Sequence, residues 1–138
     1  MVRHVAWDAA YLRVPWPSCW CCWRLPDALA DRALQVWKDT FRHSYVESAA
    51  FEKDLQSAHL GWVMMSMSLS WNHAVDGAPQ TPDEQAVMPT RRAILAHRLA
   101  GAPFVETVPH LSALAVELAE VTGSAWGEEP LPFAPAFR

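Results

Sequence analysis

Hydrophobic residues recur at helical spacing along this chain, and no alternation of period two persists over more than four residues. The clearest stripe steps by three or four residues through Phe51, Leu55, Ala58, Trp62, Met65 and Leu69. Ser48 precedes the stripe as a candidate N-cap, and Asp76-Gly77 follows it as a turn signal. The pattern predicts a long helix that begins after Ser48, ends near Asn72 and turns this stripe toward the core.

Further helices are predicted from local start and stop signals. Thr90 is a candidate N-cap and Gly101 a candidate stop for one of them. The last helix is expected to bury Leu111, Leu114, Leu118 and Val121, which again step by three or four. These helices cover about residues 4–13, 26–46, 90–100 and 109–122, with one more short helix expected after Thr81. The predicted fold class is therefore all-α, a compact bundle of about five helices in a single domain over residues 1–138.

Composition supports a folded domain and excludes two classes of partner. Of the 138 residues, 51% are hydrophobic and 19% are charged, which is enough apolar material for a core. The formal net charge is −4 and no basic run exceeds Arg91-Arg92, so we expect no nucleic-acid binding. The longest apolar stretch, Leu60 to Leu69, is too short for a membrane span, so we expect no membrane partner.

The three cysteines, Cys19, Cys21 and Cys22, lie too close together to form ordinary disulfides with each other, and no distant cysteine exists. This pattern is typical of a reducing compartment, and the N-terminus shows no signal-peptide pattern. We therefore predict a cytoplasmic location. The thiols have three interpretations: structural side chains, a reactive thiol, or part of a metal site. Because no second ligand pair of the zinc type is present, we predict no metal.

Motifs for common reactions are missing from the sequence. The six histidines form no HExxH pair, no serine lies in a G-x-S-x-G turn, and the glycines make no phosphate loop. Asp83-Glu84 fits the first turn of a helix, where carboxylates complement the helix dipole. We predict no catalytic residue and no bound cofactor for this chain by itself.

The segment from Val14 to Leu25 is the most distinctive part of the chain, because it is rich in proline, cysteine and tryptophan. We expect it to be irregular and packed on the body of the domain. One interpretation is a wall of a small-molecule pocket, to which Arg13 or Arg24 adds a charge; the other is a hydrophobic plug between helices. The predicted substrate-pocket residues are Arg13, Trp16, Cys19, Trp20 and Trp23.

The run from Asp8 to Cys21, DAAYLRVPWPSCWC, followed by Arg24-Leu25-Pro26, suggests a family. It resembles a bacterial group of phosphotransferase-like proteins in the aminoglycoside phosphotransferase and choline kinase-like superfamily. The resemblance continues at Thr90-Arg91-Arg92, at the helix that contains Leu111 and at the closing segment from Leu131 to Arg138. It therefore spans nearly the whole chain, as the C-terminal helical part of such a protein.

This resemblance implies that the chain corresponds to one part of a larger enzyme. In similar proteins a small N-terminal lobe binds ATP, an HxD…N loop supplies the base, and a following aspartate motif holds magnesium. None of these motifs occurs in this sequence, so ATP and magnesium are implied only for a full-length relative. By the resemblance, Asp8 corresponds to a structural aspartate that bonds to backbone.

The expected function is a helical acceptor-substrate lobe of a phosphotransferase-like protein, truncated and not catalytic alone. Its partner would be the missing N-terminal lobe. The alternative is a stand-alone helical interaction module that docks a partner protein through a Trp-rich face. A third possibility is a small-molecule-binding domain without catalysis.

Overall fold

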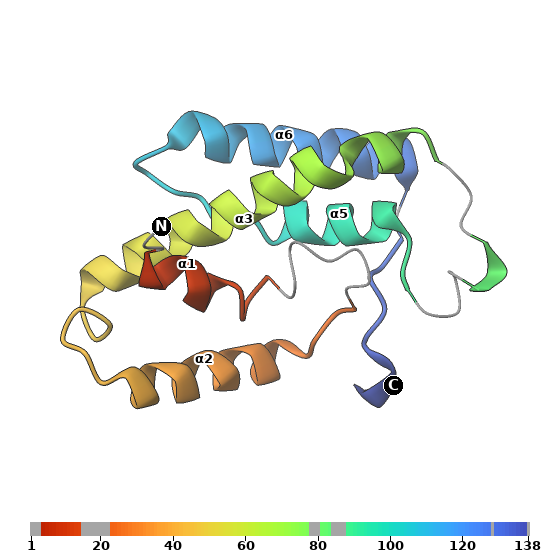
Figure 1. The fold of residues 1–138 in the computed structure, drawn as a ribbon. Helices are drawn as coiled ribbons and strands as arrows, with labels where there is room; N and C mark the ends of the chain where they lie inside the picture. Colours follow the sequence, from red (N-terminus) through yellow and green to blue (C-terminus); the bar gives the residue numbers. More distant parts are fainter. Residues whose placement is uncertain (1–3, 15–22, 78–80, 84–87, 128, 138) are drawn as a thin grey trace.

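The computed structural model describes residues 4–14, 23–77, 81–83, 88–127 and 129–137. Its helices, shown in Figure 1, are α1 (Val5–Ala10), α2 (Asp27–Phe41), α3 (Ala49–Val75), α5 (Arg91–Ala100) and α6 (Pro109–Trp126), followed by a 3₁₀ turn η1 (Pro135–Phe137). No strand occurs within these described ranges, where an isolated parallel bridge joins Arg24 to Phe133. The prediction of an all-α bundle of about five helices is confirmed.

The long helix α3 organises the packing. It contacts α1 along its first half and α5 along its second half, and α5 in turn contacts α6. Figure 1 shows α3 running diagonally across the molecule, with α6 along one edge. A helix that contacts different neighbours on different sides must be apolar on more than one face, and α3 has no single polar side along its length.

Local capping signals gave correct helix starts. The Ser48 hydroxyl accepts a hydrogen bond from the backbone N–H of Phe51, and the Thr90 hydroxyl accepts one from Ala93. Each cap satisfies a backbone donor that the first helical turn leaves open. Gly101 follows α5 as predicted, and its N–H donates to the carbonyl of His97.

Helix ends differed from the predictions at four places. α1 ends at Ala10 instead of Arg13. α2 stops at Phe41 instead of Val46, because Arg42 adopts a left-handed conformation with φ of 40°. α3 continues to Val75, one turn beyond the predicted end. α6 passes through Gly123 and continues to Trp126, and Gly127 (φ 73°) then ends it. A Cβ atom built at Gly123 would meet nothing within 4 Å, so packing does not require glycine at this position.

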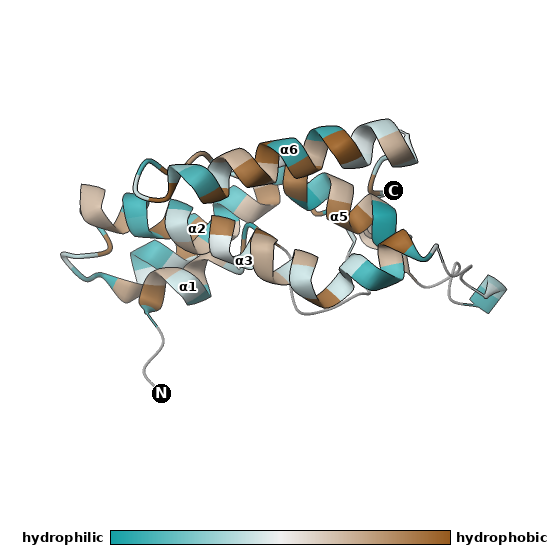
Figure 2. Cartoon of the chain, turned by 90° about the horizontal axis from the view of Figure 1, so that it is seen from above, coloured by the Kyte–Doolittle hydropathy of each residue, from teal (hydrophilic) through white to brown (hydrophobic). Residues whose placement is uncertain are grey.

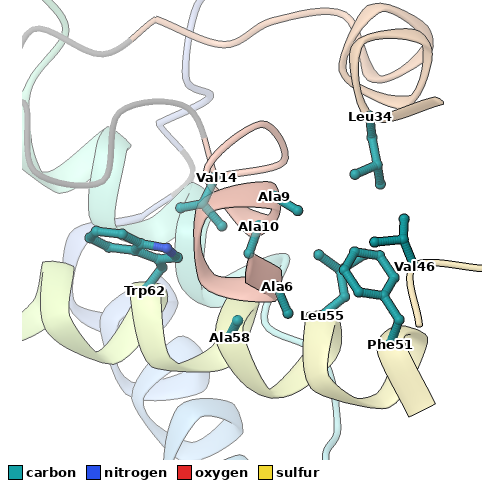
Figure 3. Packing of buried hydrophobic residues seen from close by; sticks show 10 residues of the cluster. All are labelled: Ala6, Ala9, Ala10, Val14, Leu34, Val46, Phe51, Leu55, Ala58 and Trp62. Atoms are coloured by element: carbon teal, nitrogen blue, oxygen red, sulfur yellow. The ribbon is translucent and has the colours of Figure 1, made fainter. Parts of the chain in front are cut away.

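The first hydrophobic cluster fills the angle between α1, α2 and the first half of α3 (Figure 3). Small residues of α1 face large residues of α3, and Leu34 is the buried contribution of α2. The members of this cluster are Ala6, Ala9, Ala10, Val14, Leu34, Val46, Phe51, Leu55, Ala58 and Trp62. The start of the predicted α3 stripe is thus in the core, whereas Leu69 at its end is exposed.

Gly61 allows α1 to approach α3 closely. A Cβ atom built at Gly61 would lie 2.5 Å from Cζ3 of Trp7, so only glycine fits beneath that ring. Trp7 also lies against Trp62, with ring centroids 4.9 Å apart, and its carbonyl accepts a 2.8 Å hydrogen bond from the Trp62 indole. Tyr11 meets the same indole edge-on at 5.2 Å. These contacts fix α1 on α3.

The second cluster joins α3, α5 and α6, and here one prediction was wrong. α6 buries Ser112, Ala115 and Thr122 against its neighbours. Leu111, Leu114 and Val121, which were expected in the core, are exposed, and Leu118 is half-buried. The small side chains bring α6 close to the large residues of α3 and α5, which are Leu60, Val63, Met67, Leu95 and Leu99.

Within the described residues, no helix is both long enough and apolar enough to cross a membrane.

Candidate functional site

A cavity of about 490 Å³ lies where four helices come together. Its wall is formed by the turn after α1, the start of α2, the middle of α3 and the C-terminal end of α5. The described residues that line it are Arg13, Val14, Arg24, Asp27, Ala30, Asp31, His59, His97, Arg98, Ala100 and Gly101. This volume is in the range of cavities that bind small molecules.

Three arginines from three separate segments line this cavity. Arg13 comes from the turn after α1, Arg24 from the segment before α2, and Arg98 from α5, where it is only 7% exposed. Two carboxylates, Asp27 and Asp31, are also present, so three positive and two negative groups give the lining a formal charge of +1. The cavity is therefore cationic, although the chain as a whole is acidic.

Both carboxylates pair with arginines at the rim. Nη2 of Arg13 donates to Oδ1 of Asp31 at 2.8 Å, and Nη2 of Arg24 lies 3.3 Å from Oδ2 of Asp27. The side chains of Arg13 and Asp31 are 45% and 62% exposed. Ion pairs this exposed stabilise a protein by no more than about 1 kcal/mol, so an anionic ligand can compete with the aspartates for the guanidinium groups.

The C-terminal tail holds Arg24 in place. The Arg24 N–H donates to the carbonyl of Pro132 at 2.9 Å, and its carbonyl accepts from the N–H of Ala134 at 3.0 Å. Its guanidinium lies over the ring of Phe133, 4.9 Å from the centroid, and Leu131 is buried against α5. Nε of Arg24 is buried and has no hydrogen-bond acceptor within the described part of the chain. Arg24 is thus positioned by the fold, with donor capacity left over.

Two histidines of the lining are held in the uncharged form. Burial and, to a smaller extent, the charge of Arg13 together lower the pKa of His59 to about 4. Burial also lowers the pKa of His97, with additional effects of Arg24 and Arg98 that outweigh the opposing effect of Asp27. At neutral pH each imidazole is a neutral group with one donor and one acceptor nitrogen. The fixed positive charge of the cavity therefore comes from the arginines.

The structure brings one of the predicted pocket residues to this cavity. Arg13 lines it, whereas Trp23 is half-buried and is not part of the described lining. Trp16, Cys19 and Trp20 lie outside the described residues. Whether the Trp-rich segment is a pocket wall or a plug stays a prediction.

Asp8, the predicted structural aspartate, is exposed in the first turn of α1. Its backbone carbonyl accepts a 3.3 Å hydrogen bond from Tyr11. A carboxylate at this end of a helix is favoured by the helix dipole, which accounts for its position without a role in the cavity.

The sequence did not predict three of the site residues, His59, His97 and Arg98. All three are far from Arg13 in the sequence, and the two histidines belong to a scattered set of six without metal or catalytic spacing. The one local signal was the pair His97-Arg98 in the last turn of α5, and a basic pair there is usually explained by the helix dipole. Their convergence with Arg13 and Arg24 results from helix packing, which no motif records.

The described residues of this cavity do not indicate a metal site. The described residues contain no group of three histidine, cysteine, aspartate or glutamate side chains that could hold a metal ion. The arginines that dominate the lining are donors of hydrogen bonds to oxyanions.

Comparison of the chain with protein-family models, curated proteins and solved structures found no match.

Proposed function

We propose that this chain binds a small anionic molecule, a phosphate ester or a carboxylate, in the cavity lined by Arg13, Arg24 and Arg98. The presence of three arginines from separate segments in the lining of one cavity is the observation that supports this function. Guanidinium groups bind phosphate and carboxylate oxygens through paired, charge-assisted hydrogen bonds. The volume of about 490 Å³ suits a metabolite and is too small for a polymer.

The ligand would bind by exchanging partners at the rim. Asp27 and Asp31 occupy the outer arginines in the structure, and both carboxylates are well exposed to water. A phosphate that displaces them takes over bonds to two guanidinium groups at once, while each aspartate is released into solvent. Neutral His59 and His97 can then donate further hydrogen bonds without adding charge.

The resemblance to phosphotransferase-like proteins suggests where this binding site would lie in a larger protein. We propose that the cavity is on the acceptor-substrate side of such a protein in the cytoplasm. Residues of an ATP-binding lobe would supply the transfer chemistry there. For this chain alone the proposal is limited to binding. A cationic cavity favours an acceptor that already has a phosphate or carboxylate group.

Isothermal titration calorimetry with inorganic phosphate, glucose 6-phosphate and succinate tests the proposal, with choline as the cationic control. We expect at least one anion to bind and choline to give no heat. Arg13→Gln should weaken anion binding about tenfold, since it removes one charge-assisted contact. Asp31→Asn should tighten binding, because it frees Arg13 from its rim partner.

Arg42→Gln is the matched control, because Arg42 is exposed at the opposite end of α2 and does not line the cavity. It should leave binding unchanged. The proposal fails if no anion binds, or if Arg42→Gln and Arg13→Gln weaken binding equally, which would indicate only a general charge effect.

A further inference from the structure

α6 presents its large apolar residues to solvent and its small residues to the core. Ser112, Ala115 and Thr122 are buried, and Ala119 and Trp126 are half-buried on the same side. The exposed fractions of Leu111, Leu114 and Val121 are 36%, 42% and 60%. Figure 2 shows hydrophobic bands recurring along the length of α6 at the periphery of the molecule.

Leu111, Leu114 and Val121 form a regular stripe together with Leu118, which is half-buried and also packs against the second cluster. Leu111, Leu114, Leu118 and Val121 are separated by three, four and three residues, which places them in one row beside the buried face. This spacing is the seam by which one helix packs against another. A row of this kind on the surface of a folded chain marks an interaction site, since isolated exposed apolar residues need no such order.

The charges around the stripe identify the kind of partner. α6 contains two glutamates, Glu117 and Glu120, both of them exposed, and no lysine or arginine. Glu117, which is exposed, lies three residues after Leu114 and four before Val121, so it borders the stripe. A second copy of α6 would bring acidic residues against acidic residues, and an anionic lipid surface would be repelled as well. A basic helix would be attracted.

We propose that the α6 stripe is a docking surface for a basic amphipathic helix of a partner protein. Leucine-type residues of that helix would pack between Leu111, Leu114, Leu118 and Val121, and its flanking lysines or arginines would face Glu117. α6 has 18 residues and is therefore about 27 Å long at 1.5 Å per residue, which corresponds to about five turns of a partner helix. This surface is separate from the arginine cavity.

Fluorescence anisotropy with synthetic peptides tests this inference on the full chain. The probe is a labelled helical peptide of about 18 residues, equal to α6, with leucine at the seam positions and lysine beside them. The comparison peptide replaces each lysine with glutamate. We expect the lysine peptide to bind at least about tenfold more tightly than the glutamate peptide, because charge complementarity distinguishes them.

Variants of the chain locate the binding surface. Leu114→Glu combined with Val121→Glu should weaken the lysine peptide at least about tenfold, since it places charge within the seam. Glu117→Gln should weaken it by about two- to fivefold, as expected for one exposed charge pair. Val36→Glu is the control, because Val36 is similarly exposed on α2, away from α6. It should change nothing.

Three results would overturn the inference. One is equal binding of the lysine and glutamate peptides. Another is an equal loss from Val36→Glu, with circular dichroism showing that each variant is folded. The third is a dimer in light scattering that Leu114→Glu with Val121→Glu dissociates, which would make a second copy the occupant. Phosphate titration of the same double variant should be unaffected, so failure here is distinguishable from failure at the cavity.

Discussion

The first half of α3 and the whole of α6 both have apolar stripes of the same spacing, but they bury opposite kinds of residue. α3 buries Phe51, Leu55 and Trp62, whereas α6 buries small residues such as Ser112 and Ala115 and leaves Leu114 exposed. The difference arises from the neighbours. Large side chains of a central helix leave room for small ones on the helix that packs against it, so the two sets interdigitate.

In α1, small residues also face the core, but the large aromatic residue of the same helix is covered as well. α1 contributes Ala6, Ala9 and Ala10 to the core, as α6 contributes its small residues. Trp7 of α1 and Tyr11, which directly follows the helix, both contact the ring of Trp62. Of the α6 leucines, Leu118 packs partly against the second cluster, whereas Leu111 and Leu114 are exposed. Within the described residues, the aromatic side chains at α1 are therefore covered by α3, whereas α6 leaves Leu111, Leu114 and Val121 exposed.

Removing one large side chain from each helix tests this difference most strongly. Trp62→Ala should lower the free energy of unfolding by about 3–5 kcal/mol, because it empties a core position and removes the anchor of α1. Leu114→Ala should lower it by less than about 1 kcal/mol, since its side chain is already in solvent. Urea denaturation measures both. Equal losses would mean that the α6 stripe contributes to the core after all.

Features that depend on neighbouring residues in the chain were predictable from the sequence. The caps at Ser48 and Thr90 and the stop at Gly101 each need only a few residues in a row. The buried face of α6 was not predictable in this way. Two stripes of identical spacing compete there, and only the large residues already present on α3 and α5 decide between them.

The cavity shows the same limit of local reasoning. Arg13 was expected in a pocket because it borders a distinctive segment, and Arg24 was considered with it. His59, His97 and Arg98 had no sequence relation to Arg13, and the packing of α5 against α3 brings them close. Helical periodicity describes one helix at a time, whereas a site formed by four segments depends on how they cross.

The cavity and α6 are expected to differ in how they make the stability of the chain depend on pH. Since burial holds the pKa of His59 at about 4, below the ordinary value of 6.5, the unfolded chain takes up a proton between these values and the folded chain does not. Stability should be complete above pH 6.5 and fall as the pH decreases toward 4. The loss from His59 should reach about 2 kcal/mol at pH 5, with a smaller contribution of the same sign from His97.

Urea unfolding at pH 7.5 and pH 5 checks this expectation with two variants. His59→Gln, on α3, should lose most of the pH dependence, because glutamine does not titrate. His110→Gln, at the exposed start of α6, should keep it. A wild-type chain equally stable at both values would show that His59 is protonated freely, and the surroundings assigned to it would then be wrong. Added phosphate should restore part of the stability at pH 5 if the cavity binds anions.

The smallest and sharpest test uses one glycine from each helix. Alanine is the better helix former by about 1 kcal/mol, so Gly→Ala in an open helical position stabilises a protein. At Gly123 in α6, nothing lies within 4 Å of the position that a Cβ would occupy, and Gly123→Ala should raise the free energy of unfolding by up to about 1 kcal/mol. Gly61 in α3 lies under Trp7, and a Cβ 2.5 Å from that ring must displace it.

Gly61→Ala should therefore lower the free energy of unfolding by about 1–2 kcal/mol, because overpacking exceeds the gain in helix propensity. The shift of Trp7 should also change the near-ultraviolet circular dichroism of the Trp7–Trp62 pair, which Gly123→Ala should leave unchanged. If both alanines stabilised the chain, α1 would not be closely packed on α3. Opposite signs for one identical substitution would instead show that α3 is enclosed at this point and that the outer face of α6 is open.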